Sequence, residues 1–174
     1  MRKILSEKIG LPLSDKLNKH QTRKFYQLFI SSLNWSKDEL ISYQVKKVKE
    51  LLEYSYKYSP FYKKRLDDSG LNIKSFNYLD ELQKIPPLTR SDIQNNLNSI
   101  VSSEFALSEY SRGSSSGSTG HPVIYYHDKI GTSASKASAL FSRYLSGYRM
   151  GDPWINIWGN PTAVNVEWKK PGSK

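Results

Sequence analysis

The sequence contains no cysteine and only three histidines and two methionines among its 174 residues. Without cysteine, neither a disulfide framework nor a thiolate metal site can form, and three scattered histidines argue against a histidine-rich metal site. No stretch of eighteen apolar residues occurs, and the first residues lack the apolar run of a signal peptide. We therefore expect a cytoplasmic protein with no transmembrane segment, in which any metal accompanies a nucleotide.

The net charge of +10 is unevenly distributed along the chain. Residues 1–75 carry 16 Lys/Arg against 8 Asp/Glu, whereas residues 76–174 carry 10 against 8. A basic segment with interleaved aromatics suggests nucleic acid or a membrane surface, but aromatics at helical spacing more often form a core, and no nucleic-acid module is visible. We do not expect nucleic acid as a partner. Residues 22–33, with Phe25 and Phe29 near one face, suit a docking helix better than a membrane helix.

Hydroxyl groups and glycines are concentrated in Ser114-Ser115-Ser116-Gly117-Ser118-Thr119-Gly120-His121-Pro122. Small side chains leave the backbone N–H groups accessible, the hydroxyls add donors, and the two glycines tolerate positive φ angles. This composition predicts a loop that binds an anion such as phosphate.

Other motifs fit the same residues less well. No Lys follows Gly117 or Gly120 at Walker A spacing, and a Gly-x-Gly-x-x-Gly fingerprint is absent. The run from Gly113 to Gly117 satisfies Gly-x-Ser-x-Gly, but a strand pattern follows it instead of a helix, and no histidine lies beyond Asp128 to complete a hydrolase triad. A flexible Ser/Gly linker is the alternative that composition leaves open.

Residues 115–122 resemble the Ser/Thr-Ser-Gly-Ser/Thr-Thr-Gly-x-Pro signature of adenylate-forming, AMP-binding enzymes. The surrounding sequence is most similar to the phenylacetate-CoA ligase and capsular-polysaccharide-biosynthesis ligase-like branch. The segments that carry this closer resemblance cover about residues 40–160, and they are 51–62, Ile85-Pro86-Pro87-Leu88-Thr89-Arg90-Ser91-Asp92 and Gly151-Asp152-Pro153.

The resemblance implies a ligase that uses ATP and Mg²⁺ to convert a small-molecule carboxylic acid into an acyl-adenylate, with coenzyme A as the acyl acceptor. It implies that the loop contacts the β- and γ-phosphates, and that the hydroxyls of Ser118 and Thr119 are the main side-chain donors. The phosphate-binding residues that it implies are Ser115, Ser116, Gly117, Ser118, Thr119 and Gly120.

The sequence departs from this family pattern in one important respect. The Tyr-x-x-Thr/Ser-Glu segment, the ribose-binding aspartate and the lysine of the mobile C-terminal domain have no counterpart in it. We therefore interpret the chain as a truncated N-terminal fragment that is inactive alone, and we assign no catalytic residue and no metal ligand. The alternative is a non-catalytic binding module whose basic helical surface recruits an acidic partner. The oligomeric state stays open.

The expected fold class is α/β: an N-terminal helical region followed by the first strands and helix of an adenylate-forming-enzyme N-terminal domain, which is incomplete here. Residues 1–35 are expected to form a basic arm with one helix, residues 36–105 a helical cap, and residues 106–174 the start of the AMP-binding core with its phosphate loop.

Local signals place the individual elements. Ser36 with Glu39 predicts a capping box, Gly70 and the prolines at 86 and 87 predict helix ends, and Thr89 predicts another cap. Strands are expected at 107–115 and 123–127 as an antiparallel hairpin with the loop at its tip. A helix over 130–150 and a strand over 154–158 should follow, with turn or cap roles for Asp128 and Asp152.

Overall fold

The computed structural model describes residues 5–115, 123–153 and 155. The described part is mostly helical and contains one two-stranded antiparallel sheet, which is compatible with the expected α/β class. The elements in chain order are η1 (Ser6–Gly10), α2 (Leu11–Asn18), α3 (Thr22–Ser32), α4 (Lys37–Tyr58), α5 (Pro60–Ser69), η2 (Ile73–Ser75), η3 (Leu79–Lys84), α6 (Arg90–Ile100), η4 (Leu107–Glu109), β1 (Ser111–Ser114), β2 (Ile124–His127) and α7 (Lys129–Leu145).

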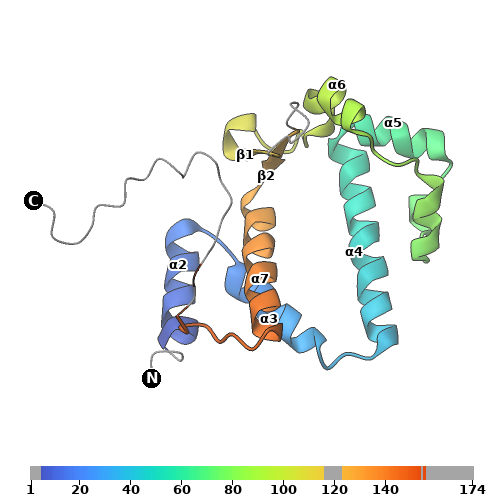
Figure 1. The fold of residues 1–174 in the computed structure, drawn as a ribbon. Coiled ribbons are helices and arrows are strands. Elements are labelled where there is room, and N and C mark those ends of the chain that lie inside the picture. Colours follow the sequence, from blue (N-terminus) through green and yellow to red (C-terminus); the bar gives the residue numbers. More distant parts are fainter. Residues whose placement is uncertain (1–4, 116–122, 154, 156–174) are drawn as a thin grey trace, which may run out of the picture.

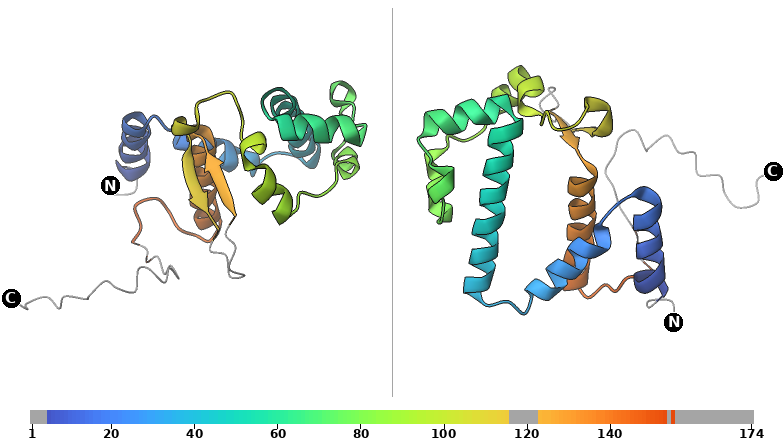
Figure 2. Two further views of the ribbon diagram at one scale, coloured as in Figure 1. Left: turned by 90° about the horizontal axis from the view of Figure 1, so that it is seen from above. Right: turned by 180° about the vertical axis from the view of Figure 1, so that it is seen from behind.

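The long helices α4 and α7 lie roughly parallel to each other (Figure 1). Helix α3 and the segment after it connect these two helices at one end, and α6 and the β1–β2 hairpin lie at the other end. Viewed from above, the hairpin stands over one end of α7, with α2 on one side and α4 and α5 on the other (Figure 2). This arrangement brings the hairpin close to the C-terminal end of α4.

Helix α4 begins at the capping box that the sequence predicts. Ser36 Oγ accepts a hydrogen bond from the Glu39 amide at 3.2 Å, and the Ser36 amide donates to Glu39 Oε2 at 2.8 Å. This backbone hydrogen bond lowers the pKa of the Glu39 carboxyl. The helix ends at Tyr58, with Ser59 as its C-cap directly before Pro60, and Gly70, with a φ of 67°, is the C-cap of α5.

The main hydrophobic core lies on one side of α4, where α5 and the segment after it fold back. Leu52, Leu66, Leu71 and Phe76 are buried, and Phe76 is completely inaccessible to solvent. The partly buried side chains that pack against them are Val45, Val48, Ile73, Leu79, Leu82 and Ile85. Val45, Val48 and Leu52, spaced three and four residues apart on α4, therefore face this core.

Arg65 joins α5 to the proline turn that precedes α6. Its Nη2 donates to the carbonyl oxygens of Pro86 and Pro87, both at 2.6 Å, and its Nη1 lies 4.0 Å from Asp92. The Arg65 side chain is only 16% exposed. Because a guanidinium presents several donors in a fixed plane, one side chain can hold both carbonyls and fix the approach to α6.

Helix α3 packs against α7, more than a hundred residues away in the sequence. The rings of Phe29 and Phe141 are 5.8 Å apart, and Tyr26 is 6% exposed. The Gln21 amide at the start of α3 donates to Ser133 Oγ at 3.0 Å, and Ser133 is fully buried in the contact. Helix α3 is thus a docked helix. The sequence predicted one helix before residue 36, whereas the structure has η1, α2 and α3 there.

Three expected element boundaries differ or lie outside the described residues. The strand predicted from Leu107 begins at Ser111, because residues 107–109 form a turn of 3-10 helix in which Glu109 Oε2 accepts the Ala106 amide at 3.0 Å. The helix predicted to reach residue 150 ends at Leu145, two residues before Gly147 with its φ of 89°. Of the predicted strand 154–158, the structure describes Ile155, which is 88% exposed.

Candidate functional site

The β1–β2 hairpin confirms the antiparallel pair that the sequence predicts. Its register pairs Ser111 with His127 and Ser114 with Ile124. Beyond the last pair, the Ser115 amide donates to the Val123 carbonyl at 2.9 Å, and the Val123 amide donates to Ser115 Oγ at 2.9 Å. Ser115 therefore closes the hairpin with both its backbone and its side chain. The other predicted phosphate-binding residues, Ser116 to Gly120, lie outside the described residues, as does His121.

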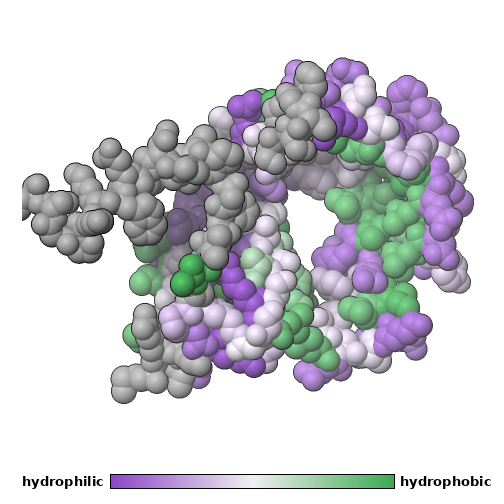
Figure 3. Space-filling model, in the orientation of Figure 1, coloured by the Kyte–Doolittle hydropathy of each residue, from purple (hydrophilic) through white to green (hydrophobic). Residues whose placement is uncertain are grey.

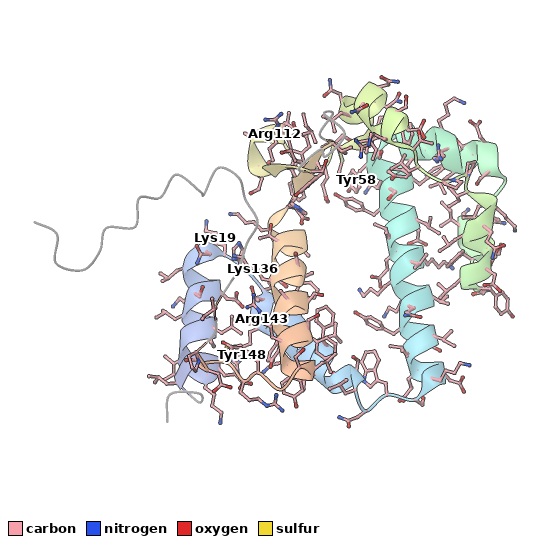
Figure 4. All side chains as sticks on the ribbon, in the orientation of Figure 1. Lys19, Tyr58, Arg112, Lys136, Arg143 and Tyr148 are labelled. Carbon is pink, nitrogen blue, oxygen red and sulfur yellow. The ribbon has the colours of Figure 1, made fainter. Side chains whose placement is uncertain are left out.

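This closure places the two ends of the loop next to each other. The Ser115 hydroxyl accepts a hydrogen bond from the Val123 amide, which leaves its O–H group and one lone pair for other partners. A strand, not a helix, follows the loop, which is the arrangement that argued against a hydrolase elbow in the sequence. Arg112 is exposed on β1 opposite Tyr126, and Figure 4 shows it in the hairpin region above α7.

A network of hydroxyl groups connects the C-terminal end of α4 to the segment that leads into the hairpin. The Tyr54 hydroxyl lies 2.7 Å from Ser102 Oγ and donates to Glu104 Oε2 at 2.7 Å. The Ser103 amide and hydroxyl both donate to the Tyr58 carbonyl, at 2.8 and 2.9 Å. Partial burial, together with the hydrogen bond to Glu104, raises the pKa of Tyr54 to about 12.

Hydrogen bonds from Ser59 and Tyr110 also hold residues 99–102 in place. Ser59, which is 4% exposed, donates its hydroxyl to the carbonyls of Ser99 and Ile100 at 3.0 and 2.9 Å. The Tyr110 hydroxyl, directly before β1, donates to the Ser102 carbonyl at 3.2 Å. The end of α4 therefore positions the chain as it enters β1, and so positions the hairpin.

A cavity of about 380 Å³ lies between α4, α6 and the hairpin. Its lining residues are largely apolar or aromatic, and Tyr54, Ser102, His127 and Asp128 are among those with polar side chains. The other lining residues include Leu97, Val101, Tyr110, Val123, Tyr125 and Tyr126. A recess of this size and lining suits an aliphatic or aromatic group with a few polar contacts. Figure 4 shows Tyr58 on the side of α4 that faces α7.

Asp128 and Asp152 have the structural roles that the sequence predicts. Asp128 caps α7, since its Oδ1 accepts the Gly131 amide. Asp152 Oδ2 accepts the Arg149 amide at 2.8 Å in the turn after α7. Among the residues that the structure describes, no group of three or more His, Asp or Glu side chains is placed to hold a metal ion.

Sequence reasoning missed Tyr54, Ser59, Ser102 and Tyr110 as parts of this site. Tyr54 and Ser102 are 48 residues apart, and the resemblance of residues 51–62 to the ligase family gave Tyr54 no role. The interleaved tyrosines of residues 54–62 were visible in the sequence, but their spacing indicated only a helix face. Their partners become apparent only when α4 and residues 99–104 are placed side by side.

Comparison with known proteins finds similarity to phenylacetate-coenzyme A ligases. The chain is 28% identical to the enzyme of Thermus thermophilus over 127 residues, which are 71% of this chain and 28% of that enzyme. It is 30% identical to the Escherichia coli enzyme over 92 residues, which are 51% of this chain and 20% of that enzyme. No family model matches the chain.

Over the matched part, the chain is therefore similar to phenylacetate-coenzyme A ligases, the branch that the sequence resembles. It spans about a quarter of the length of the curated relatives that it matches.

Proposed function

We propose that this chain supplies the phosphate-binding part of an ATP-dependent ligase that activates a small carboxylic acid as its acyl-adenylate. The observation that carries the proposal is the hairpin closed at Ser115 and Val123, from whose tip the serine-glycine segment departs. Similarity to two phenylacetate-coenzyme A ligases supports it. Such a ligase would act in the cytoplasm, where ATP and coenzyme A are available.

In this proposal, residues 115–120 hold the β- and γ-phosphates through backbone amides and hydroxyls. Mg²⁺, bound together with the nucleotide, would neutralise the charge on those oxygens. The substrate carboxylate attacks the α-phosphorus, the bond to the bridging oxygen breaks, and pyrophosphate leaves. A thiol such as that of coenzyme A then takes the acyl group and releases AMP.

The chain by itself is proposed to bind triphosphate without catalysing this reaction. Groups that orient the ribose and neutralise the α-phosphate supply several kcal/mol in such reactions, on the order of 3 kcal/mol for one donor. The sequence contains no counterpart of the family segments that supply them. These groups would come from residues outside the 174 of this sequence.

Calorimetric titration with ATP, tripolyphosphate and AMP tests the phosphate site. We expect ATP and tripolyphosphate to bind in the presence of Mg²⁺, and AMP to bind much more weakly, because the loop contacts the terminal phosphates. The double variant Ser118→Ala/Thr119→Val should weaken tripolyphosphate binding by about tenfold, which corresponds to one or two lost charge-assisted hydrogen bonds.

Ser146→Ala, at an exposed serine after α7, is the matched control and should bind as the parent does. Tripolyphosphate binding that is absent, or that survives both loop substitutions, would refute the phosphate site. ATP–pyrophosphate exchange by these 174 residues alone with aryl or fatty acids would refute the proposal that they bind triphosphate without catalysing the reaction.

A further inference from the structure

Helix η1 and helix α2 carry a row of exposed apolar side chains at every fourth position. Leu5, Ile9, Leu13 and Leu17 are 55%, 57%, 54% and 75% exposed. Within the part of the chain that the structure describes, no residue of η1 or α2 is buried. Four large apolar groups therefore form a continuous row on the surface of a short helical segment.

The opposite side of this segment holds it against the rest of the molecule. Asp15 Oδ2 accepts the Arg23 amide at 2.7 Å, and the Asp15 carbonyl accepts the His20 amide at 2.8 Å. Glu7 lies close enough to the Tyr26 hydroxyl to raise its pKa, although burial is the larger cause. The Asp15 side chain is thus directed toward α3, and helical periodicity places the apolar row on a different face of the helix.

The position of α2 leaves this row accessible. Helix α2 stands at the edge of the molecule beside α7 (Figures 1 and 2). The space-filling view shows apolar residues along the outer edge at α2 (Figure 3).

The charges around the row are predominantly positive. Residues 1–24 contain seven Lys/Arg and two Asp/Glu, and the two acidic residues are Glu7 and Asp15. Lys16 follows Leu13 by three residues and therefore shares its face of the helix. Lys19 and Lys136 stand at the end of α2 and on the neighbouring part of α7 (Figure 4), where Lys136 Nζ lies 3.2 Å from His20 Nδ1.

We propose that η1 and α2 form an interfacial helix that binds the surface of an anionic lipid bilayer. The apolar row would enter the boundary between headgroups and acyl chains, and the lysines beside it would contact lipid phosphates. A second copy of the chain fits this surface less well, because it would bring two basic surfaces together. Binding of this kind is peripheral: none of the described helices has the length and apolarity that a membrane crossing requires. The proposal does not depend on the ligase function.

Sedimentation with lipid vesicles tests the proposal on the full chain. We expect binding to vesicles of phosphatidylcholine with phosphatidylglycerol, and little binding to phosphatidylcholine alone. The variant Leu13→Gln/Leu17→Gln removes half of the apolar row, and Lys16→Glu/Lys19→Glu reverses two charges. Each should lower the partition coefficient by about tenfold, since apolar burial and attraction to anionic lipid both contribute to interfacial binding.

The matched control is Leu51→Gln/Leu145→Gln, which changes two leucines on α4 and α7 that are 61% and 60% exposed. Helical content from circular dichroism checks that each variant folds. The control should bind the anionic vesicles as the parent does. Equal loss in the control, or no binding of the parent to anionic vesicles, would refute the proposal. So would a dimer by light scattering that Leu13→Gln/Leu17→Gln dissociates, because the row would then be a contact between copies.

Discussion

The ring of Tyr125 lies directly over Gly113, its partner across the hairpin. A Cβ atom placed on Gly113 would be 2.4 Å from Cε2 and 2.7 Å from Cζ of that ring. The φ angle of Gly113 is not positive, so the glycine is needed here for space and not for its backbone conformation. Tyr125 also contacts His127 edge-on, with 4.9 Å between ring centroids, so an aromatic pair covers this side of the hairpin.

Gly113→Ala should therefore displace the Tyr125 ring. Because Tyr125 is 44% exposed, the ring can move outward, and we expect a loss of about 1 kcal/mol in the free energy of unfolding. In a Tyr125→Ala background the same substitution should cost little. Urea denaturation of the four proteins in this double-mutant cycle measures the coupling, and additive effects would contradict the contact.

Ser133→Ala should weaken the docking of α3 on α7. The substitution leaves the Gln21 amide without its acceptor in a contact where Ser133 is fully buried, at a cost of about 1–2 kcal/mol. Thermal unfolding followed by circular dichroism measures it. Ser138→Ala, at an exposed position on the same helix, is the control and should unfold within about 0.5 kcal/mol of the parent.

Arg65→Met should destabilise the connection between α5 and α6. It leaves the carbonyls of Pro86 and Pro87 without their charged donor, and we expect a loss of about 2 kcal/mol in the free energy of unfolding. Lys64→Met, at the adjacent residue, removes an exposed pair with Asp68 and should cost clearly less than Arg65→Met. Guanidinium denaturation compares the two, and similar losses would show that Arg65 does not hold the turn.

The raised pKa of Tyr54 predicts that the folded chain loses stability at alkaline pH. Its pKa is about 12 in the folded chain and near its ordinary value of 10.0 when unfolded, so the folded state retains the proton more strongly. This contribution is fully present below pH 10 and is lost as the pH rises through 12. Tyr54→Phe should therefore flatten the dependence of unfolding free energy on pH between about 10 and about 12.

Denaturation of the parent and of Tyr54→Phe at several alkaline pH values measures this difference. If Tyr54→Phe leaves the pH dependence of the unfolding free energy unchanged, folding does not raise the pKa of Tyr54.

Local signals predicted the helices well because each depends on a few adjacent residues. The capping box of Ser36 and Glu39 and that of Thr89 and Asp92 are both formed, and Gly70 ends α5 in the left-handed conformation. Prolines and glycines define these ends through their own backbone restrictions, so no distant residue has to be known.

Contacts between distant segments could not be predicted in this way. Ser133 accepts a hydrogen bond from the Gln21 amide because α3 and α7 pack together. No sequence pattern in either helix predicts this contact. The same holds for Tyr54 with Ser102 and Glu104. For the candidate site, the sequence predicted the hairpin and Ser115 near its tip, but it did not indicate the hydroxyl network that positions the strand. The phosphate contacts of residues 115–120 stay a prediction.

The pairing of Gln21 with Ser133 has a consequence for synthesis on the ribosome. These residues are separated by 112 positions, whereas α4 contacts α5 and α5 contacts α6 over short distances in the chain. The segment from α4 to α6 can assemble as soon as it emerges, but the aromatic side of α3 has no docking surface until α7 has left the exit tunnel. Until then Tyr26 and Phe29 remain exposed to chaperones and to other nascent chains. The packing of α3 against α7 is therefore a late, non-local step of folding.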